Sequence, residues 1–409
     1  MKLFEELKLR GLVKDIAGED LEEKINNTSL TFYWGTDPTA DSLHLGHYSS
    51  LVTAKRLAKA GHKPILLVGG ATGLIGDPRE TSEREIIDIK TVEENVISLT
   101  KQVKKIVGEN TIVVNNFDWM KDFSFIKFLR DIGKHININY MLDKDIIRRR
   151  LDVGITYAEF SYTLIQGYDY LHLFKDKNVT LQAAGSDQWG NITTGIELIK
   201  KVTGENVYGF TMPLILDSTG KKFGKSEGNA LWLDEEKTSS YSMYQYLINT
   251  EDSKVEEYLK VFTFLSLDEI DSIITEHNEN PHLRIAQKSL AYEIIKDLHG
   301  KDAYDSAKKI SEALFSGDIN NLSEKDLVEA FSNTDSFNFE LNHNIIDILV
   351  NNNITSSKRE AREFVNNKSI SVNGNKIDNI DLIITKELLL YDKYLIIRKG
   401  KKKYFIGTI

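Results

Sequence analysis

The first half of the chain alternates between short apolar runs and longer stretches in which apolar residues recur every three or four positions. The short runs are rich in β-branched and aromatic residues or are continuously apolar, which predicts strands of a buried parallel sheet. They lie at residues 30–36, 64–68, 111–114, 179–184 and 213–216. Because helical stretches separate them, the pattern indicates an α/β domain with a doubly wound sheet.

The helices between these strands are predicted from the same periodicity. One begins at Leu45 and ends near Gly61, a residue suited to a left-handed C-terminal cap. Others cover residues 86–107 and 157–174, and helical spacing resumes over 241–315. The second half of the chain is therefore expected to begin with a mainly helical domain.

The last part of the chain has a different pattern, in which a short amphipathic helix precedes a hairpin. Lys358, Arg359 and Arg362 lie three and four positions apart on one side of this helix, whose other side is apolar. An Asn-Gly pair at 373–374 predicts a tight hairpin turn. We therefore expect a small α+β domain over residues 343–409.

Charge is distributed unevenly between this C-terminal part and the remainder. Residues 343–409 hold twelve Lys and Arg residues against seven Asp and Glu residues, whereas the whole chain has a formal net charge of −9. A basic module attached to an acidic body predicts that the C-terminal part contacts nucleic acid. The alternative is an ordinary solvated surface.

Length and composition set the outer bounds. A chain of 409 residues is long for a single core, so two or three domains are expected. No run of eighteen apolar residues is present and charged residues interrupt the N-terminus, which predicts a cytosolic protein without membrane contact. The absence of cysteine excludes disulfides, thiolate chemistry and cysteine-ligated metal, and the nine histidines are too scattered to predict a metal site.

The most informative stretch is 33–47, where a strand, a turn containing Pro38 and the start of a helix follow one another. A helix that starts at the end of a strand directs free N–H groups and the positive end of its dipole at one point, which favours phosphate. Gly46 leaves room for a nucleotide ring against the backbone, and His44 and His47 face the same point from one turn. The alternative is that both histidines only cap the helix.

A second polar cluster is predicted within the helix at 157–174. Tyr162, Gln166 and Asp169 fall on one face at positions i, i+4 and i+7. A phenol, an amide and a carboxylate in a row can hold a zwitterionic ligand with a polar tip; the alternative is a solvated helix face. Residues 185–191 again place a polar turn between a strand and a helix, where open α/β sheets bind ligands.

Two glycine-containing loops complete the candidate site. The loop at 69–78 lacks the glycine spacing of a dinucleotide-binding fingerprint, so we expect it to bring backbone close to a ligand and to present Asp77. The loop at 217–229 carries three lysines among glycines, including Lys222 and Lys225. Such a loop suits a mobile clamp on a polyphosphate, with a solvated basic turn as the alternative.

Four of these motifs, in this order, resemble those of a known family. The sequences His-Leu-Gly-His at 44–47 and Lys-Phe-Gly-Lys-Ser at 222–226 are similar to the two signature motifs of class I aminoacyl-tRNA synthetases. Residues 161–166 and 185–191 resemble the bacterial tyrosyl-tRNA synthetases in particular. The resemblance covers the whole length and implies a Rossmann-like catalytic domain that activates L-tyrosine with ATP and charges tRNA(Tyr).

The resemblance also implies which residues bind tyrosine. The matching positions are Tyr33, Asp77, Tyr162, Gln166, Asp169 and Gln188. Among them, Tyr33 and Asp169 are expected to contact the substrate hydroxyl, whereas Tyr162, Gln166 and Asp77 hold its ammonium group.

For ATP and catalysis the resemblance implies two overlapping sets. The ATP-binding positions are Gly35, Asp37, Gly46, His47, Gly185, Asp187 and Lys225. The catalytic positions are Thr39, His44, His47, Lys222 and Lys225. No side chain needs to act as nucleophile or base, because positioning and charge stabilisation suffice, aided by a magnesium ion that accompanies ATP. No tightly bound metal held by the protein is expected.

The resemblance further implies the organisation of the whole chain. It gives a catalytic domain with a helical insertion at 1–220, the mobile loop and an anticodon-contacting helical domain at 221–326, a linker rich in polar residues at 327–342, and an S4-like RNA-binding domain at 343–409. Lys358, Arg359 and Arg362 are the expected RNA contacts. The family also implies a homodimer.

Two alternative functions stay open on the sequence. A tryptophanyl enzyme of the same class is disfavoured because Tyr33 and Asp169 offer polar partners for a hydroxyl, and because a basic tail is not expected there. An RNA-binding paralogue without catalysis is disfavoured by the intact signature motifs at 44–47 and 222–226.

Overall fold

The computed structural model describes residues 1–78, 87–226, 229–332, 334–400 and 403–409, and only the backbone of 225, 226 and 229 is described. The chain forms two compact units. Unit 1 contains Met1–Thr238 and Thr250–Leu298, and unit 2 contains Ser239–Asn249 and His299–Ile409. Within these described ranges, no helix is both long enough and apolar enough to cross a membrane.

Unit 1 is built on a six-stranded sheet with the order β1-β6-β5-β2-β3-β4. Its strands are β1 (Ile16–Ala17), β2 (Thr31–Thr36), β3 (Lys63–Val68), β4 (Ile112–Asn115), β5 (Leu181–Gly185) and β6 (Tyr208–Met212). Every pair is parallel except β1 with β6. Phe32, Tyr33 and Trp34 are all buried, as expected for a strand covered on both faces. The predicted doubly wound sheet is therefore confirmed.

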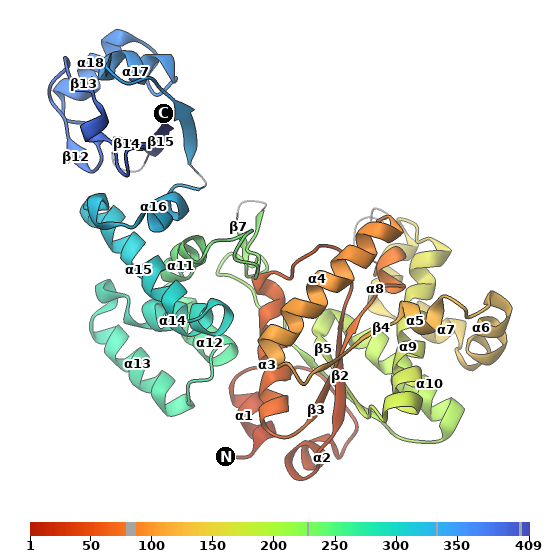
Figure 1. Cartoon of the computed structure of the whole chain (residues 1–409). Helices are drawn as coiled ribbons and strands as arrows, with labels where there is room; N and C mark the ends of the chain where they lie inside the picture. The colour runs from red at the N-terminus through yellow and green to blue at the C-terminus, as the bar shows by residue number, and fades with distance from the viewer. Residues whose placement is uncertain (79–86, 227–228, 333, 401–402) are drawn as a thin grey trace. The chain divides into compact units, whose positions relative to one another are not determined.

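Helices lie on both sides of this sheet (Figure 1). α3 (Leu45–Lys59) and α4 (Ile89–Val107) pack against each other and against β3. α9 (Tyr157–Lys177) and α10 (Trp189–Thr203) pack on the face that carries Tyr33, Ile65 and Leu67. From β2 the chain adds β3 and β4 on one edge of β2, and it then returns to place β5 and β6 on the opposite edge. The direction of winding therefore reverses between β2 and β5. The loops that follow these two strands therefore border the usual ligand site of an open α/β sheet.

The rest of unit 1 is mostly helical. Its remaining elements are α1 (Leu3–Leu9), α2 (Leu21–Asn27), α5 (Phe117–Met120), α6 (Phe125–Asp131), α7 (Ile138–Leu142), α8 (Asp145–Leu151), β7 (Lys225–Ser226), β8 (Asn229–Ala230), α12 (Asp252–Phe262), α13 (Leu267–Glu279) and α14 (Ile285–His299). Buried Arg56 of α3 pairs with Glu6 at 3.0 Å and donates to the carbonyl of Thr263 at 2.7 Å. These bonds fix α3, which begins at the candidate histidines, to α1 and to the end of α12.

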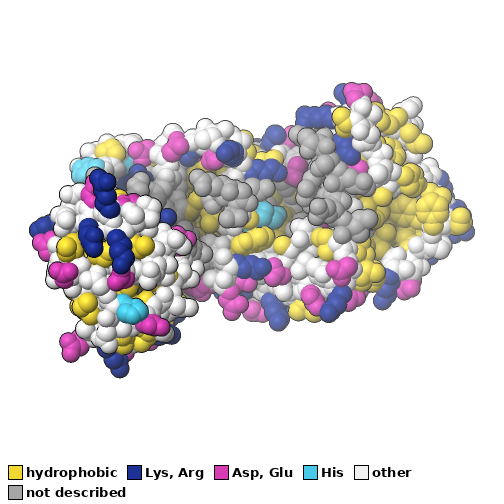
Figure 2. All heavy atoms as spheres, turned by 90° about the horizontal axis from the view of Figure 1, so that it is seen from above, with side chains coloured by type: hydrophobic (Ala, Val, Ile, Leu, Met, Phe, Trp, Pro, Cys, Tyr) yellow, Lys and Arg dark blue, Asp and Glu magenta, His cyan; other side chains and the backbone are white. Residues whose placement is uncertain are grey.

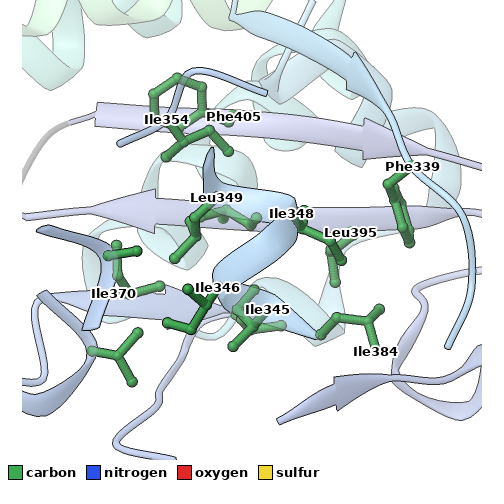
Figure 3. Packing of buried hydrophobic residues seen from close by; sticks show 14 of the residues in the cluster. Phe339, Ile345, Ile346, Ile348, Leu349, Ile354, Ile370, Ile384, Leu395 and Phe405 are labelled. Carbon is green, nitrogen blue, oxygen red and sulfur yellow. The ribbon is translucent and has the colours of Figure 1, made fainter. Parts of the chain in front are cut away.

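Unit 2 joins helices to a small sheet. Its helices are α11 (Ser240–Ile248), α15 (Lys301–Ser316), α16 (Glu324–Ala330), α17 (Ile345–Asn351) and α18 (Lys358–Asn366). The strands β9 (Asp335–Asn338), β11 (Ile370–Val372), β12 (Asn375–Lys376), β14 (Tyr394–Lys399) and β15 (Lys403–Thr408) form a sheet, and β10 (His343–Asn344) pairs with β13 (Ile383–Ile384). Figure 3 shows Ile346 and Leu349 of α17 directed at a core that includes Leu395 and Phe405.

The C-terminal elements agree with the sequence pattern. α18 begins at Lys358, and Ala361 and Val365 on its apolar side are buried. Asn373 and Gly374 have φ of 47° and 84°, the positive values that a tight hairpin turn between β11 and β12 requires. The predicted helix and hairpin are confirmed.

Three element predictions need correction. Residues 213–216 do not form a strand: the sheet strand is β6, which ends at Met212, because Pro213 has no N–H to donate to a ladder. The segment 327–342 is not a bare linker, since it holds the end of α16 and strand β9, which pairs in parallel with β15. The exposure of β9 explains its polar sequence. The helix predicted at 86–107 begins at Ile89, and residue 86 lies outside the described residues.

Candidate active site

A cavity of about 250 Å³ lies at the carboxyl ends of β2 and β5. The start of α3, the loop after β3 and α9 complete its wall. The predicted site residues that line it are Tyr33, Gly35, Asp37, Thr39, Gly46, His47, Asp77, Tyr162, Gln166, Asp169, Gly185, Asp187, Gln188 and Lys222. Side chains predicted from separate stretches of the sequence therefore surround one cavity.

One wall of the cavity is a buried carboxylate held by two donors. Asp169 is 1% exposed, and its oxygens accept hydrogen bonds from Nδ2 of Asn116 at 3.0 Å and from Nε1 of Trp119 at 2.8 Å. Burial raises the pKa of Asp169 to about 7, although both hydrogen bonds oppose this shift; the charge of Asp37 adds to it. The carboxyl group is thus fixed in place and close to its titration point at neutral pH.

Tyr33 supplies a second polar group on this wall. Its buried hydroxyl has no hydrogen-bond partner among the described residues. Burial, followed by the charge of Asp169, raises the pKa of Tyr33 well above its ordinary value, so the hydroxyl stays protonated. An unpaired buried hydroxyl costs about 1–3 kcal/mol, which a polar ligand atom would recover. Tyr33 and Asp169 together suit a ligand hydroxyl, which both donates and accepts.

Asp37, directly after β2, accepts hydrogen bonds from two hydroxyl groups. The donors are Oγ1 of Thr72 at 2.7 Å and the hydroxyl of Tyr162 at 2.9 Å. Burial, followed by the charges of Asp37 and Asp77, raises the pKa of Tyr162 well above its ordinary value. The Tyr162 oxygen can therefore still accept a hydrogen bond from a cationic ligand group.

An amide chain forms the next part of the wall. Nε2 of Gln188 donates to Oδ2 of Asp77 at 2.7 Å. Nδ2 of Asn191, on the first turn of α10, donates to Oε1 of Gln188 at 2.9 Å and to Oε1 of Gln166 at 3.0 Å. Asp77, Gln166 and Gln188 thus enter the cavity as one connected set rather than as separate side chains.

Two turns beside the cavity require glycine. A Cβ at Gly69 would lie 2.1 Å from Oγ1 of Thr72 and 2.3 Å from Oδ1 of Asp37. At Gly185 it would lie 2.6 Å from Oδ1 of Asp187. Both glycines let the backbone approach polar side chains of the site, whereas the predicted approach of the 69–78 loop to a ligand stays a prediction.

The start of α3 agrees with part of the prediction. His44 is the N-cap residue: its Nδ1 accepts from N of Gly46 at 3.1 Å, and Nδ1 of His47 accepts from N of His44 at 3.4 Å. The two imidazole centroids are 4.0 Å apart. His47 lines the cavity, whereas His44 lies behind it with its ring facing Trp232. The pair therefore caps the helix, and His47 also faces the cavity, while contact with a ligand stays a prediction.

The neighbourhood of Gly46 is tighter than the sequence suggested. A Cβ there would lie 2.8 Å from Cε1 of His44 and 3.2 Å from the carbonyl oxygen of Phe223. Protein atoms therefore already require a glycine at this position. The approach of a nucleotide ring to it stays a prediction.

The lysine loop is anchored by an aromatic residue. Phe223 is buried, with its ring centroid 4.3 Å from that of Tyr258 and 4.9 Å from that of Phe262. Beside this anchor, Lys222 is exposed and lines the cavity. The side chain of Lys225 lies outside the described residues, so its predicted role stays a prediction.

The predicted RNA contacts belong to unit 2, whereas the residues that line the cavity belong to unit 1. Lys358, Arg359 and Arg362 are exposed on α18. Nζ of Lys358 is 2.6 Å from Oδ1 of Asp347, so part of its charge is already compensated. Figure 2 shows Lys and Arg side chains grouped over α17 and α18.

Sequence reasoning missed several residues that hold the site together. Asn116 directly follows β4 and Trp119 lies on α5, where no motif was recognised, yet both donate to Asp169. A polar residue directly after a parallel strand was the available signal for Asn116. Thr72 and Asn191 hydrogen-bond to other side chains of the site. Their partners, Asp37 for Thr72 and the two glutamines for Asn191, were predicted as site residues, but Thr72 and Asn191 were not. Across the described part of the chain, no group of three or more His, Asp or Glu side chains is arranged to hold a metal ion.

Comparisons with known proteins identify the family to which the chain is similar. Residues 25–316 match the family tRNA synthetases class I (W and Y), and residues 326–407 match the Tyrosine--tRNA ligase SYY-like C-terminal domain. The chain is 47% identical, over 417 aligned residues and 100% of both chains, to proteins named tyrosine--tRNA ligase from Streptococcus pneumoniae serotype 19F (strain G54) and strain CGSP14.

Solved structures give the same result. A C-terminally truncated mitochondrial tyrosyl-tRNA synthetase of Aspergillus nidulans is 33% identical with a TM-score of 0.69, over 77% of this chain and 94% of that one. The corresponding enzyme of Coccidioides posadasii is 31% identical with a TM-score of 0.66, over 76% and 91% of the two chains. These matches confirm the resemblance predicted from the sequence, and the chain belongs to the class I tyrosyl-tRNA synthetase family.

Proposed function

We propose that the protein is a tyrosine–tRNA ligase, which activates L-tyrosine with ATP and transfers the tyrosyl group to the 3′-terminal adenosine of tRNA(Tyr). The observation that carries this proposal is the pair formed by the fixed carboxyl group of Asp169 and the buried hydroxyl of Tyr33, which has no hydrogen-bond partner among the described residues. The 47% identity to tyrosine--tRNA ligases over the full length supports it independently.

Selectivity for tyrosine follows from hydrogen bonding. Tyr33 and Asp169 can both pair with a phenol hydroxyl. When phenylalanine enters, the Tyr33 hydroxyl stays without a partner among the described residues and Asp169 gains no further donor. Sites of this kind reject the analogue that lacks the hydroxyl by about 10⁴–10⁵, and tyrosyl-tRNA synthetases are the known case of the higher value. A tryptophan substrate would bring an N–H donor but no acceptor for Tyr33.

The ammonium group of tyrosine is expected at the opposite polar cluster. Asp77 offers a carboxylate, and Tyr162 and Gln166 offer neutral oxygens at the same cavity wall. An ammonium group has three donors and no acceptor, so three oxygen acceptors match it.

Activation joins the tyrosine carboxylate to the α-phosphate of ATP and breaks the bond to the β-phosphate oxygen, so pyrophosphate leaves with growing negative charge. The N-terminus of α3, Thr39, His47 and Lys222 border the cavity where this charge would develop. We assign His44 a supporting position behind His47, and Lys225 a second cation of the loop. A magnesium ion is proposed to enter with ATP as part of the substrate.

Transfer and partners follow from the remaining features. A hydroxyl of the terminal adenosine would attack the activated carbonyl and release AMP, while α18 would bind tRNA through Lys358, Arg359 and Arg362. The part of the chain up to residue 220, together with the lysine loop that follows it, would then carry the chemistry, and residues 343–409 the RNA contacts. A cytosolic location is proposed because these substrates occur there.

We also propose a homodimer, formed through the apolar surface of the insertion before α9. Phe125, Ile126 and Ile138 are exposed hydrophobic residues on α6 and α7. Figure 2 shows hydrophobic side chains gathered over this part of unit 1. An exposed apolar patch of this kind is typical of a subunit interface. Sedimentation equilibrium of the protein tests the proposal: a monomer at micromolar concentration would contradict it.

Tyrosine-dependent exchange of labelled pyrophosphate into ATP tests the activity. We expect exchange with tyrosine and none with tryptophan. In His44→Ala and Lys225→Ala variants, the rate of adenylate formation should fall far more than tyrosine affinity, because these groups act on charge that appears only in the transition state. Equal effects on rate and binding would refute the catalytic roles. A burst of adenylate in the wild type would exclude an RNA-binding paralogue without catalysis.

A further inference from the structure

The amide chain in the cavity wall has a direction that its hydrogen bonds determine. The carboxylate of Asp77 only accepts hydrogen bonds, so Gln188 must turn Nε2 toward it, at 2.7 Å. Oε1 of Gln188 then faces Asn191, which must present its amino group, at 2.9 Å. The same nitrogen is 3.0 Å from Gln166, so Gln166 has to turn its carbonyl oxygen toward Asn191. The acceptor at Asp77 thereby determines an amide orientation three side chains away.

Asn191 is the central member of this chain, although it does not line the cavity. Its side chain is 6% exposed and lies on the first turn of α10, while Asp77, Gln166 and Gln188 form the wall in front of it. An amide nitrogen carries two hydrogens, and Asn191 directs one to each glutamine. It therefore couples two wall residues from behind.

We propose that Asn191 is a positioning residue, which sets the amide orientations of Gln166 and Gln188 and so determines how the cavity receives the ammonium group of the amino acid. This inference rests on the proposed function, because it assigns the ammonium group of tyrosine to Gln166 and Asp77.

The physical reason is that an amide can rotate by a half-turn with little change in shape. After such a rotation Gln166 would present an –NH₂ group where an ammonium group needs an oxygen, and two donors facing each other repel. Gln188 would likewise lose its bond to Asp77 if it turned. Removing the donor at Asn191 leaves the rotation of Gln166 unopposed and leaves Gln188 held by Asp77 alone, so orientation is lost even where every wall residue is still present.

Three ligands separate this role from a general loosening of the site. Tyrosine carries a phenol, an ammonium and a carboxylate group; tyramine lacks the carboxylate, and 3-(4-hydroxyphenyl)propionate lacks the ammonium. Their dissociation constants are measured by equilibrium dialysis and by competition with labelled tyrosine, using the full chain. The variants are Asn191→Leu, which has similar volume but no donor, and Asn191→Ser.

In Asn191→Leu we expect tyrosine and tyramine to bind about tenfold more weakly or worse, and the propionate to change by less than about threefold. Asn191→Ser should give the same order of losses, because one hydroxyl hydrogen can serve only one glutamine. The Asn191→Ser variant keeps the test possible if the Asn191→Leu variant does not fold. Equal weakening of all three ligands, or no weakening, would overturn the inference.

Thr194→Val is the matched control. Thr194 is fully buried on the same helix, and its hydroxyl donates to the carbonyl of Gly190, at 2.8 Å, rather than to a side chain of the cavity wall. Its loss should leave the three dissociation constants unchanged. Pyrophosphate exchange by the wild type is measured alongside. If the wild type exchanges with tyrosine but the variants bind all three ligands equally more weakly, only the role of Asn191 is refuted. If the wild type shows no exchange, the proposed function is refuted.

Discussion

The two sides of the cavity differ in how their polar groups are held. On the side proposed to bind the phenol, Asp169 and Tyr33 are almost completely buried, and Asn116 and Trp119 hold the carboxyl group from behind. On the side proposed to bind the polyphosphate, Thr39 and Lys222 are exposed, and His44 and His47 are partly exposed.

This difference separates selectivity from rate. A buried, fully bonded carboxylate can reject a wrong side chain because any unpaired group there is costly. An exposed lysine in a loop and polar groups at the start of a helix can gather around a charge that appears during the reaction. Substitutions on the first side should therefore change which amino acid is used, and those on the second how fast it reacts.

The largest effect is expected for Lys222→Ala. Loss of a cation near the departing pyrophosphate should lower the exchange rate by about 10²–10³, with tyrosine affinity nearly unchanged. Lys221→Ala is the control, because Lys221 is an exposed neighbour that does not line the cavity. A loss confined to tyrosine binding, or an equal loss in both variants, would remove the contrast between the two sides.

The next effect is expected for Trp119→Phe, which keeps a ring but removes the N–H donor to Asp169. A hydrogen bond to a charged group contributes about 1.5–3 kcal/mol, so discrimination of tyrosine against phenylalanine should fall by about 10–100-fold. The ratio of exchange rates with the two amino acids measures it. Trp189→Phe, outside the cavity wall, should keep the wild-type ratio. An unchanged ratio in Trp119→Phe would show that Asp169 needs no such support.

The pKa of Asp169 adds a pH dependence to the same wall. Because burial raises it from 3.8 to about 7, the folded protein keeps a proton that the unfolded chain releases between these values. Stability from this group is therefore fully present below about pH 4 and is lost as the pH rises toward 7. Discrimination should move the other way, since the ionised carboxyl is the stronger acceptor.

Urea unfolding and exchange ratios between pH 5 and 8 measure both trends. In Asp169→Asn the contribution of this group to the pH dependence of stability should disappear. In Trp119→Phe the transition in discrimination should shift to higher pH, because the lost hydrogen bond had lowered the pKa. A wild-type discrimination ratio that is flat across this range would contradict the assignment of Asp169.

A smaller effect is expected for Tyr33→Phe. Tyrosine should bind about tenfold more weakly, because one hydrogen bond to its hydroxyl is lost, while protein stability should not fall. Tyr170→Phe is the control for which the opposite result is expected. The Tyr170 hydroxyl donates to the carbonyl of Tyr208 at 2.8 Å, so its loss should lower the free energy of unfolding by about 1 kcal/mol and leave tyrosine binding unchanged. Isothermal titration and urea unfolding of both variants measure this crossing pattern. The same pattern in both variants would refute it.

The smallest change is expected on α18, where the cations are again exposed. The double substitution Arg359→Ala and Arg362→Ala should weaken tRNA binding. In a plot of log K against log salt concentration, it should also make the slope smaller in magnitude by about 2. Lys358→Ala should do less, because Lys358 already pairs with Asp347. Filter binding at several salt concentrations measures the slopes. An unchanged slope in the double variant would exclude α18 from the RNA contact.

The sequence predicted the residues that lie on regular elements or in contiguous motifs. Tyr162, Gln166 and Asp169 follow helical spacing and all line the cavity, as does His47 at the start of α3. The parallel strands β2, β3, β4 and β5 were predicted because their runs are apolar or rich in β-branched and aromatic residues.

The supporting residues could not be predicted in the same way. Trp119 lies on a helix of one turn and contacts a residue 50 positions away, so no periodicity marks it. Asn191 was part of a recognised motif, but its role depends on which way two glutamine amides point. The strand expected at 213–216 failed because the apolar run follows a proline, and β6 was hidden by its mixed sequence.

Amino-acid-dependent pyrophosphate exchange, measured with tyrosine, phenylalanine and tryptophan on the same protein sample, tests the central claim most directly. The account predicts exchange with tyrosine, exchange with phenylalanine lower by about 10⁴–10⁵ in kcat/KM, and none with tryptophan. Exchange with tryptophan at a rate comparable to that with tyrosine, or no exchange with tyrosine at all, would contradict it.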